Sequence, residues 1–243
     1  MSDDHADAAR LAEEAGHLLL GLRARIGKEP AEDVRDAGDR LSNELLIGLL
    51  AAEHPSDAVL SEESTDDPAR LTAPRVWVID PLDGTREFGE PPRTDWAVHV
   101  ALVSEHAPVA GAVALPARGL VLSTGAPPAV PPPTGRPRLV VSRTRPPEST
   151  ALLAEALGAE LVPMGSAGAK AMAIVLGEAD VYAHSGGQHE WDSAAPVAVA
   201  AASGLHCSRL DGSPLRYNQP DPWLPDLLIC RPELAARVID ALR

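Results

Sequence analysis

The chain has 243 residues, of which 21 are basic and 35 are acidic, and its formal net charge at pH 7 is −14. Such a charge argues against a nucleic-acid polymer or an anionic membrane as partner. No apolar run approaches the about 18 residues of a membrane-spanning helix and the N-terminus lacks a basic secretion signal, so we expect a cytoplasmic protein. Because 45% of the residues are hydrophobic but only 3% are aromatic, we expect a core of Ala, Val and Leu in layers of helix and sheet.

Two helices are expected in the first part of the chain. Apolar residues recur at helical spacing from Ala6 to Ile26 and again from about Asp39 to Ala52. Residues 27–38 between them, GKEPAEDVRDAG, are polar and broken by Gly and Pro, which predicts a mobile loop. A short buried strand follows within residues 57–64, DAVLSEES, and β-rich runs over residues 95–124 predict an antiparallel meander.

The best domain boundary is the proline-rich segment 125–137, which has six prolines in thirteen residues and can join neither a helix nor a sheet. Strands alternate with helices beyond it: strands are expected at 138–142, 161–165 and 181–184, and helices at 147–159, 166–180 and 191–204. We therefore predict an N-terminal α+β domain, residues 1–130, and a C-terminal α/β domain, residues 137–243. The free thiols Cys207 and Cys230 fit a reducing compartment and are assigned no chemistry.

Two carboxylates stand close together in RVWVIDPLDGTREF, residues 75–88. Pro81 cannot donate to a sheet ladder, so the strand should end at Asp80, with Asp83 in the turn that follows. Gly84 allows a close backbone approach, and Thr85 could cap a short helix. Buried carboxylates repel each other unless a cation neutralises them, and magnesium, which prefers oxygen ligands, is the natural candidate. The peptide carbonyl of Leu82 is a further oxygen ligand.

Other acids strengthen this interpretation. Glu62 and Glu63 follow a predicted strand, and Asp192 stands near the start of a predicted helix. Taken singly, the acids are about as well explained by a capped turn, a solvated strand end and a helix N-cap. Taken together, they indicate a phosphatase in which magnesium ions hold the phosphate and activate a water.

Three segments, SEES, DPLDGTREF and EWDSAAPVAVAAASG, resemble the lithium-sensitive, magnesium-dependent phosphatases of the inositol monophosphatase superfamily. With VVSRTR, GSAGAK, GEADVY and the late hairpin DGSPLRYN, the resemblance covers nearly the whole chain. It implies an α/β fold, a layered α-β-α-β-α sandwich with an antiparallel-rich N-terminal half and an α/β C-terminal half. The REF after DGT and the Ser-Arg of VVSRTR are most similar to the CysQ-type 3'(2'),5'-bisphosphate nucleotidases. That branch implies hydrolysis of adenosine 3',5'-bisphosphate, or of its sulfated precursor, in sulfate assimilation.

The resemblance also implies a role for each site residue. A first Mg²⁺ would be held by Glu62, Asp80 and the Leu82 carbonyl, a second by Asp80, Asp83 and Asp192, and a third, weaker ion would lie near Glu62 and the mobile loop. Asp39, which would open the second helix, and Thr85 would orient and deprotonate the attacking water, with Glu62 also catalytic. The implied substrate contacts are Asp83, Gly84, Thr85, Arg86, Arg143, Ser166, Lys170 and Asp192. Relatives are often homodimers, so a homodimer is possible here.

Some residues and alternatives stay open. Asp36 stands where the family usually has Thr, which leaves its role and that of Lys28 undecided. His184 and His189 flank the loop before Asp192, although loop histidines are more often simply solvated. An inositol-1-monophosphatase or a fructose-1,6-bisphosphatase is the nearest alternative function, and a non-catalytic metal-binding protein is a more distant one. A haloacid-dehalogenase-type phosphatase would place its two acids two residues apart, whereas Asp80 and Asp83 are three apart.

Overall fold

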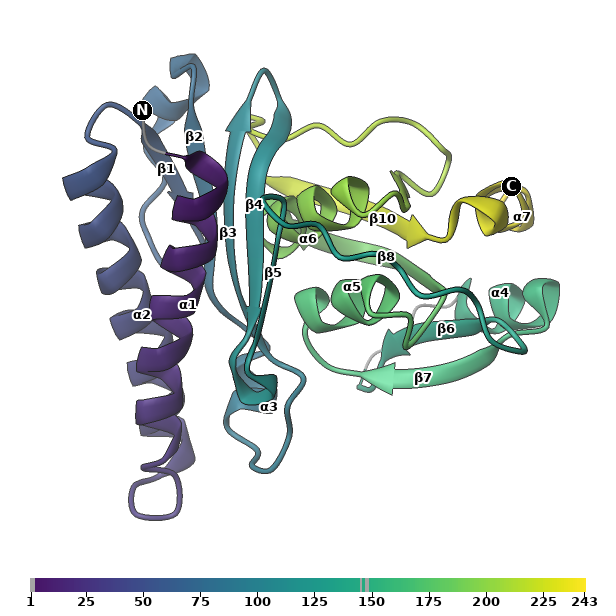
Figure 1. The fold of residues 1–243 in the computed structure, drawn as a ribbon, viewed down its shortest axis with the longest axis horizontal. Coiled ribbons are helices and arrows are strands. Elements are labelled where there is room, and N and C mark those ends of the chain that lie inside the picture. The colour runs from purple at the N-terminus through teal and green to yellow at the C-terminus, as the bar shows by residue number, and fades with distance from the viewer. Residues whose placement is uncertain (1–2, 145, 147–148) are drawn as a thin grey trace.

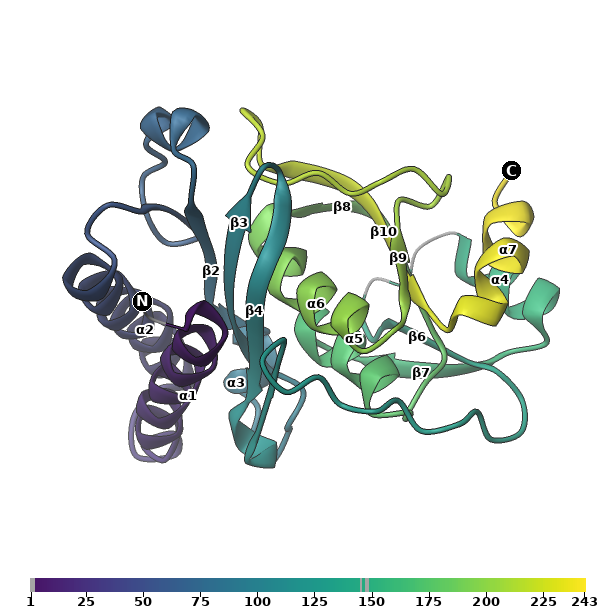
Figure 2. The ribbon, with the colours of Figure 1, turned by 45° about the horizontal axis from the view of Figure 1, so that its top comes forward.

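Two five-stranded sheets and the helices that cover them make up the computed structural model, which describes residues 3–144, 146 and 149–243. The layers follow one another as α-β-α-β-α (Figure 1). Helices α1, Asp4–Arg23, and α2, Ala31–Glu53, cover the outer face of the first sheet. Helices α5, Ala167–Val175, and α6, Glu190–Ala202, lie between the sheets, and α4, Ser149–Leu157, and α7, Pro232–Ala241, cover the far face of the second (Figure 2). This arrangement confirms the expected fold class.

The first sheet has the order β1-β2-β3-β4-β5. Its strands are β1, Ala58–Ser61; β2, Val76–Asp83; β3, Ala97–Ser104; β4, Ala107–Leu115; and β5, Leu120–Ser123. Strands β2 to β5 form the predicted antiparallel meander, and β1 is parallel to β2. Short helical segments lie at Pro68–Thr72, Thr85–Phe88 (α3) and Pro116–Arg118.

The second sheet has the order β7-β6-β8-β10-β9. Its strands are β6, Arg138–Ser142; β7, Glu160–Met164; β8, Val181–His189; β9, His206–Ser208; and β10, Trp223–Cys230. Strand β6 is parallel to β7 and β8, whereas β10 is antiparallel to β8 and β9. The predicted late hairpin DGSPLRYN lies in the connection between β9 and β10 and is not itself a strand. The first residues of the helix predicted at 147–159 lie outside the described residues.

Side chains of β2 are buried on both faces of the sheet, which is why its sequence reads as an apolar run. Trp77 and Ile79 pack under α1 and α2, while Val76 and Val78 face the middle layer. That layer is rich in Ala and closely packed: a Cβ at Gly111 would come within 2.8 Å of the Cβ of Ala198. Small residues therefore let α6 lie directly on the first sheet.

The hydrophobic cluster between the sheets joins the two halves of the chain. It includes Val78 and Val113 from the first half and Val140 and Tyr182 from the second. Residues 125–137 contain no helix or strand and connect β5 to β6. The division into domains 1–130 and 137–243 stays a prediction. None of the helices in the described part of the chain is both long and apolar enough to cross a membrane.

The mobile loop predicted at residues 27–38 is wrong, because α2 already begins at Ala31. Pro30 precedes the helix and does not break it, and Glu32 and Asp33 in the first turn interact favourably with the helix N-terminus. Val34 is buried against the core, so this turn is amphipathic even though it looked merely polar. Asp39 therefore lies inside α2 and does not open it.

The strand predicted to end at Asp80 continues to Asp83. Asp80 is the register partner of His99 and Asp83 that of Ala97, and the pairing is irregular between them. Pro81 lies in this irregular stretch, where its missing N–H leaves the ladder undisturbed. Thr85 begins α3 and does not cap it, since the N-cap is Gly84 with a left-handed φ of 85°.

Candidate active site

Acids from four elements converge at the end of β2. Asp80 and Asp83 belong to the strand itself, and Asp192 lies in the first turn of α6. Oxygens of these three carboxylates all lie within 4.8 Å of one another. Glu62, just after β1, is outside this tight group but close enough for the charges of Asp192 and Asp83 to act on it. The fourth element is α2, which contributes Asp39.

Most of these carboxyl groups are held in an environment that disfavours their charge. Burial, followed by the charges of Glu62 and Asp83, raises the pKa of Asp80 well above its usual range. Burial and Asp83 also raise the pKa of Asp192. Loss of solvent, followed by neighbouring acids, raises the pKa of Glu62 and of Asp39 to about 7. A divalent cation would relieve this repulsion, and the all-oxygen donor set fits magnesium.

Asp83 is the exception, because its charge is stabilised. Burial alone would raise its pKa, but hydrogen bonds and positive charge outweigh burial and lower the pKa to about 2. Ser166 Oγ donates to its carboxylate, as do the backbone N–H groups of Ala167 at 3.0 Å and Gly168 at 2.6 Å. Asp83 therefore also anchors the N-terminus of α5.

His99 of β3 is a site residue that the sequence interpretation missed. It is fully buried, with Nε2 3.2 Å from Asp83 Oδ2 and Nδ1 3.0 Å from the carbonyl oxygen of Trp191. Burial would lower its pKa, but Asp83 raises it. Gly168 leaves room for the ring, since a Cβ there would lie 2.0 Å from Nε2. The available signal was a lone polar residue in the apolar run WAVHVALV.

Thr85 links the acids to α2. Its Oγ1 lies 3.1 Å from Asp39 Oδ1 and 3.2 Å from the carbonyl oxygen of Leu82. Ser42 of the same helix, which the sequence did not single out, donates to the carbonyl of Pro81 at 2.7 Å. The helix thus holds the irregular end of β2 and presents Asp39 to the Thr85 hydroxyl.

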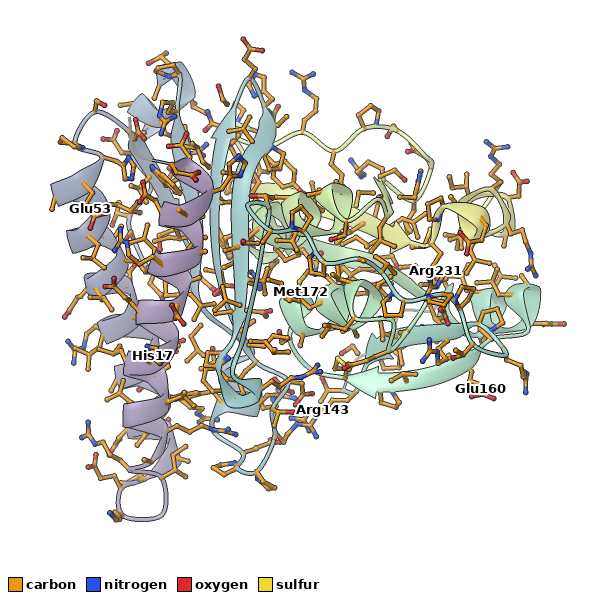
Figure 3. All side chains as sticks on the ribbon, viewed as in Figure 1. His17, Glu53, Arg143, Glu160, Met172 and Arg231 are labelled. Atoms are coloured by element: carbon orange, nitrogen blue, oxygen red, sulfur yellow. The ribbon has the colours of Figure 1, made fainter. Side chains whose placement is uncertain are left out.

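A cavity of about 230 Å³ adjoins the acids between α3, α5 and the end of β6. Six residues predicted to bind substrate line it: Gly84, Thr85, Arg86, Arg143, Ser166 and Lys170. Arg143 lies between α3 and β7 (Figure 3) and donates to Glu87 at 2.6 Å and Glu90 at 2.8 Å. Lys170 is buried, which lowers its pKa, and its Nζ donates to the carbonyl of Ser166 at 2.7 Å.

A second, mainly apolar cavity of about 420 Å³ borders the first. The two share Ser142 and Arg143. The remaining lining residues of the second are Val141, Pro146, Thr150, Ala151, Leu161 and Pro163. The cationic surface of the first cavity thus lies next to the apolar surface of the second.

The other candidates lie around this centre. His189 donates its backbone N–H to Asp192 at 2.6 Å, and its ring stacks on Trp191 with centroids 4.6 Å apart. His184 Nε2 is 3.0 Å from the carbonyl oxygen of Gly187, and both residues belong to β8. The loop predicted between His184 and His189 is therefore wrong, because the strand pairs with β10 over this stretch. Lys28 and Asp36 are exposed. The charge of Asp36 contributes to the raised pKa of Asp39.

Comparison with known proteins identifies the family of the chain. Residues 6–243 match the inositol monophosphatase family. The 3'-phosphoadenosine 5'-phosphate phosphatase of Mycobacterium tuberculosis is 55% identical over 94% of this chain and 89% of that protein. The 3'(2'),5'-bisphosphate nucleotidase CysQ of Escherichia coli is 31% identical over 88% of this chain and 94% of that protein. The crystal structure of CysQ from Bacteroides thetaiotaomicron superposes with a TM-score of 0.77 at 26% identity, covering 93% of this chain and 96% of that one. The chain belongs to the inositol monophosphatase family.

Proposed function

We propose that this chain is a magnesium-dependent, lithium-sensitive phosphatase that hydrolyses adenosine 3',5'-bisphosphate to the 5'-monophosphate in the cytoplasm, as part of sulfate assimilation. The names of the mycobacterial and CysQ relatives support this substrate. The structural observation that carries it is a pair of neighbouring cavities that share Ser142 and Arg143. Cationic side chains line one of them, and mainly apolar side chains line the other. A bisphosphate with a flat base needs both surfaces.

Glu62, Asp80, the Leu82 carbonyl, Asp83 and Asp192 would hold the magnesium ions. The raised pKa values of Asp80 and Asp192 support this assignment, because buried carboxylates of like charge call for a cation. Bound magnesium would polarise the phosphate and make a water molecule more acidic.

The chain's own residues would then position the water and move its proton. Thr85 Oγ1 would accept a proton from the attacking water while passing its own to Asp39 Oδ1, which lies 3.1 Å away. With its pKa raised to about 7, Asp39 is a suitable acceptor near neutral pH. No covalent bond to the protein forms in this route.

The remote parts of the substrate would occupy the two cavities. Arg86, Arg143 and Lys170 would contact the phosphate that is not cleaved, since a second phosphate needs cationic partners. The base would lie against Val141, Leu161 and the prolines of the apolar cavity. An inositol ring has no flat apolar face to bury there.

A substrate panel tests the proposal. We expect kcat/KM for adenosine 3',5'-bisphosphate to exceed that for inositol-1-phosphate and fructose-1,6-bisphosphate by at least about tenfold, with loss of activity on magnesium removal and inhibition by lithium. Arg143→Ala should reduce the ratio of kcat/KM for adenosine 3',5'-bisphosphate to that for inositol-1-phosphate. Arg136 is exposed and lies outside both cavities, so Arg136→Ala should leave this ratio unchanged. If kcat/KM for inositol-1-phosphate were about tenfold higher than that for adenosine 3',5'-bisphosphate, the substrate assignment would be wrong.

A rapid acid quench with labelled substrate tests the route. Direct attack by water leaves no phosphate on the protein, whereas an aspartyl-phosphate mechanism would leave it on a carboxylate. Trapped phosphoprotein would therefore refute the roles given to Asp39 and Thr85. The predicted homodimer is checked separately by light scattering on the purified protein.

A further inference from the structure

A second group of metal-ligating side chains lies at the other end of β2. Asp4 and Asp7 belong to the first turns of α1, and His54 is the C-cap residue of α2. Ligand atoms of these three residues all lie within 4.8 Å of one another. Figure 1 shows the start of α1 beside the end of α2, and Glu53, the residue before His54, marks this corner in Figure 3. The group is separate from the acids near α3.

Two buried polar atoms of this group lack hydrogen-bond partners among the described residues. The side chain of His54 is 6% exposed, and neither its Nε2 nor Asp7 Oδ2 has a hydrogen bond within the described residues. The two atoms lie 3.2 Å apart. Neighbouring ligands on one tetrahedral zinc, with bonds of about 2.0–2.1 Å, are separated by roughly 3.3 Å. The pair therefore has the spacing of two ligands of one ion, which is also the spacing of a direct ion pair.

Surrounding residues hold the group in place, as neighbours of metal ligands do. Asp57 Oδ2 lies 3.8 Å from the other ring nitrogen of His54, Nδ1, and accepts a hydrogen bond from Trp77 Nε1 at 3.0 Å. Arg75 donates to Asp57 and, at 2.8 and 3.0 Å, to both oxygens of Asp4. The His54 ring also packs on Trp77, with centroids 4.9 Å apart. A carboxylate oxygen has two lone pairs, so Asp4 can accept hydrogen bonds from Arg75 and still bind a metal.

We propose that Asp4, Asp7 and His54 bind a zinc ion, with a water in the fourth position. One imidazole nitrogen and two carboxylates are a donor set that zinc accepts, whereas magnesium strongly prefers oxygen alone. The ion would join the beginning of α1 to the end of α2. Its role is to fix the outer helical layer against the first sheet, independently of phosphate hydrolysis.

Cobalt substitution tests the site in the full-length protein. Chelator-treated protein is returned to saturating Mg²⁺, which fills the oxygen-rich active site, and is then titrated with Co²⁺. We expect about one Co²⁺ per chain with the intense visible absorption of a tetrahedral ion, displaced by one equivalent of Zn²⁺. His54→Gln and Asp7→Asn should each weaken binding by at least about tenfold. His17→Gln, an exposed histidine of α1 shown in Figure 3, is the matched control and should bind as the wild type does.

Several outcomes would overturn the proposal. A weak octahedral spectrum would contradict the tetrahedral site, and a thiolate charge-transfer band would place Co²⁺ at Cys207 or Cys230. If His54→Gln binds Co²⁺ as tightly as the wild type, the imidazole is not a ligand. If His54→Gln does not fold, Asp7→Asn, whose side chain is partly exposed, and the wild-type spectrum still decide the question.

Discussion

Asp80 and Asp83 lie three residues apart on one strand, yet their environments act on them in opposite directions. Asp80 has a raised pKa because it is buried among other acids, whereas Asp83 has a lowered pKa because His99 and Ser166 stabilise its charge. We predict that Asp80→Asn stabilises the metal-free protein by at least about 1 kcal/mol, since desolvating one charge costs several. Asp83→Asn should destabilise it by about 1.5–3 kcal/mol, the scale of hydrogen bonds to a charged group.

Urea unfolding in the presence of a chelator measures both effects, and Glu13→Gln, an exposed acid in the middle of α1, is the control. Both site variants should lose at least about a hundredfold in kcat/KM. If both variants shift stability in the same direction, the contrast between the two environments is wrong. If Asp83→Asn keeps its phosphatase activity, the metal assignment fails.

The hydroxyl of Thr85 can be tested by keeping or removing it. Thr85→Val preserves the shape of the side chain but removes the group that faces Asp39 at 3.1 Å. We expect kcat to fall by about 100-fold or more, while Thr85→Ser keeps most of the activity. KM should change little, because Thr85→Val keeps the size of the side chain in the substrate cavity and removes only the hydroxyl assigned to the water. Equal losses in both variants would assign Thr85 a packing role instead.

The acids could be predicted from the sequence, but their neighbours could not. Asp80, Asp83 and Thr85 stand in a local pattern of Asp, Pro and Gly that is legible along the chain. His99 stands 16 residues after Asp83, and only the pairing of β2 with β3 brings them together. Ser42 reaches the Pro81 carbonyl in the same way, through the packing of α2 on the sheet. Such partners depend on tertiary contacts that no short motif encodes.

At the scale of elements, two helical glycines should respond oppositely to the same substitution. In α5, a Cβ at Gly168 would meet His99 Nε2 at 2.0 Å, and the helix start that Asp83 anchors would have to shift. In α2, a Cβ at Gly48 would meet nothing within 4 Å. Gly48→Ala should therefore stabilise the protein by about 0.5–1 kcal/mol through helix propensity. Gly168→Ala should destabilise it by about 1–3 kcal/mol through overpacking.

Thermal unfolding of the two variants checks this prediction, and each serves as the control for the other. Activity gives a second readout: Gly168→Ala should also lose phosphatase activity, because His99 and Asp83 are displaced together. A neutral Gly168→Ala would show that His99 can move out of the way without cost.

Element boundaries were the least predictable part of the fold. Periodicity located most helices and strands, but the first turns of α2 looked like a loop because Pro30 and the acids around it suggested a break. The same residues favour a helix N-terminus once the core face is present. Strands β9 and β10 and helix α7 were not predicted at all. Residues 223–230, WLPDLLIC, form strand β10 because they pair with β8 on one side and β9 on the other.

At the scale of the whole molecule, the order of the elements explains why the site forms. The acids come from residues 39 to 192, and the layered arrangement brings the ends of β1 and β2 and the start of α6 to one place. The strand and helix alternation could be predicted from the sequence, and with it the presence of two sheets. The shared cluster between them could not, because it depends on how Ala-rich helices fill the space between two sheets.

The concentration of acids also predicts how the stability of the whole protein depends on pH without metal. In the folded protein Asp39 and Glu62 have pKa values of about 7, whereas in the unfolded chain they titrate near about 4. Between these values the folded state binds more protons, so the free energy of unfolding should fall as pH rises from about 4 to about 7. Saturating Mg²⁺ should remove the part of this slope that Glu62 contributes, since Glu62 is one of the carboxylates assigned to the ion. The pKa of His184 is lowered by burial, so this residue makes the free energy of unfolding rise with pH. The double variant Asp39→Asn/Glu62→Gln tests whether these two acids cause the pH dependence. In urea unfolding with a chelator, its free energy of unfolding should change less with pH than that of the wild type. An unchanged pH dependence would mean that these two carboxyl groups are not its cause.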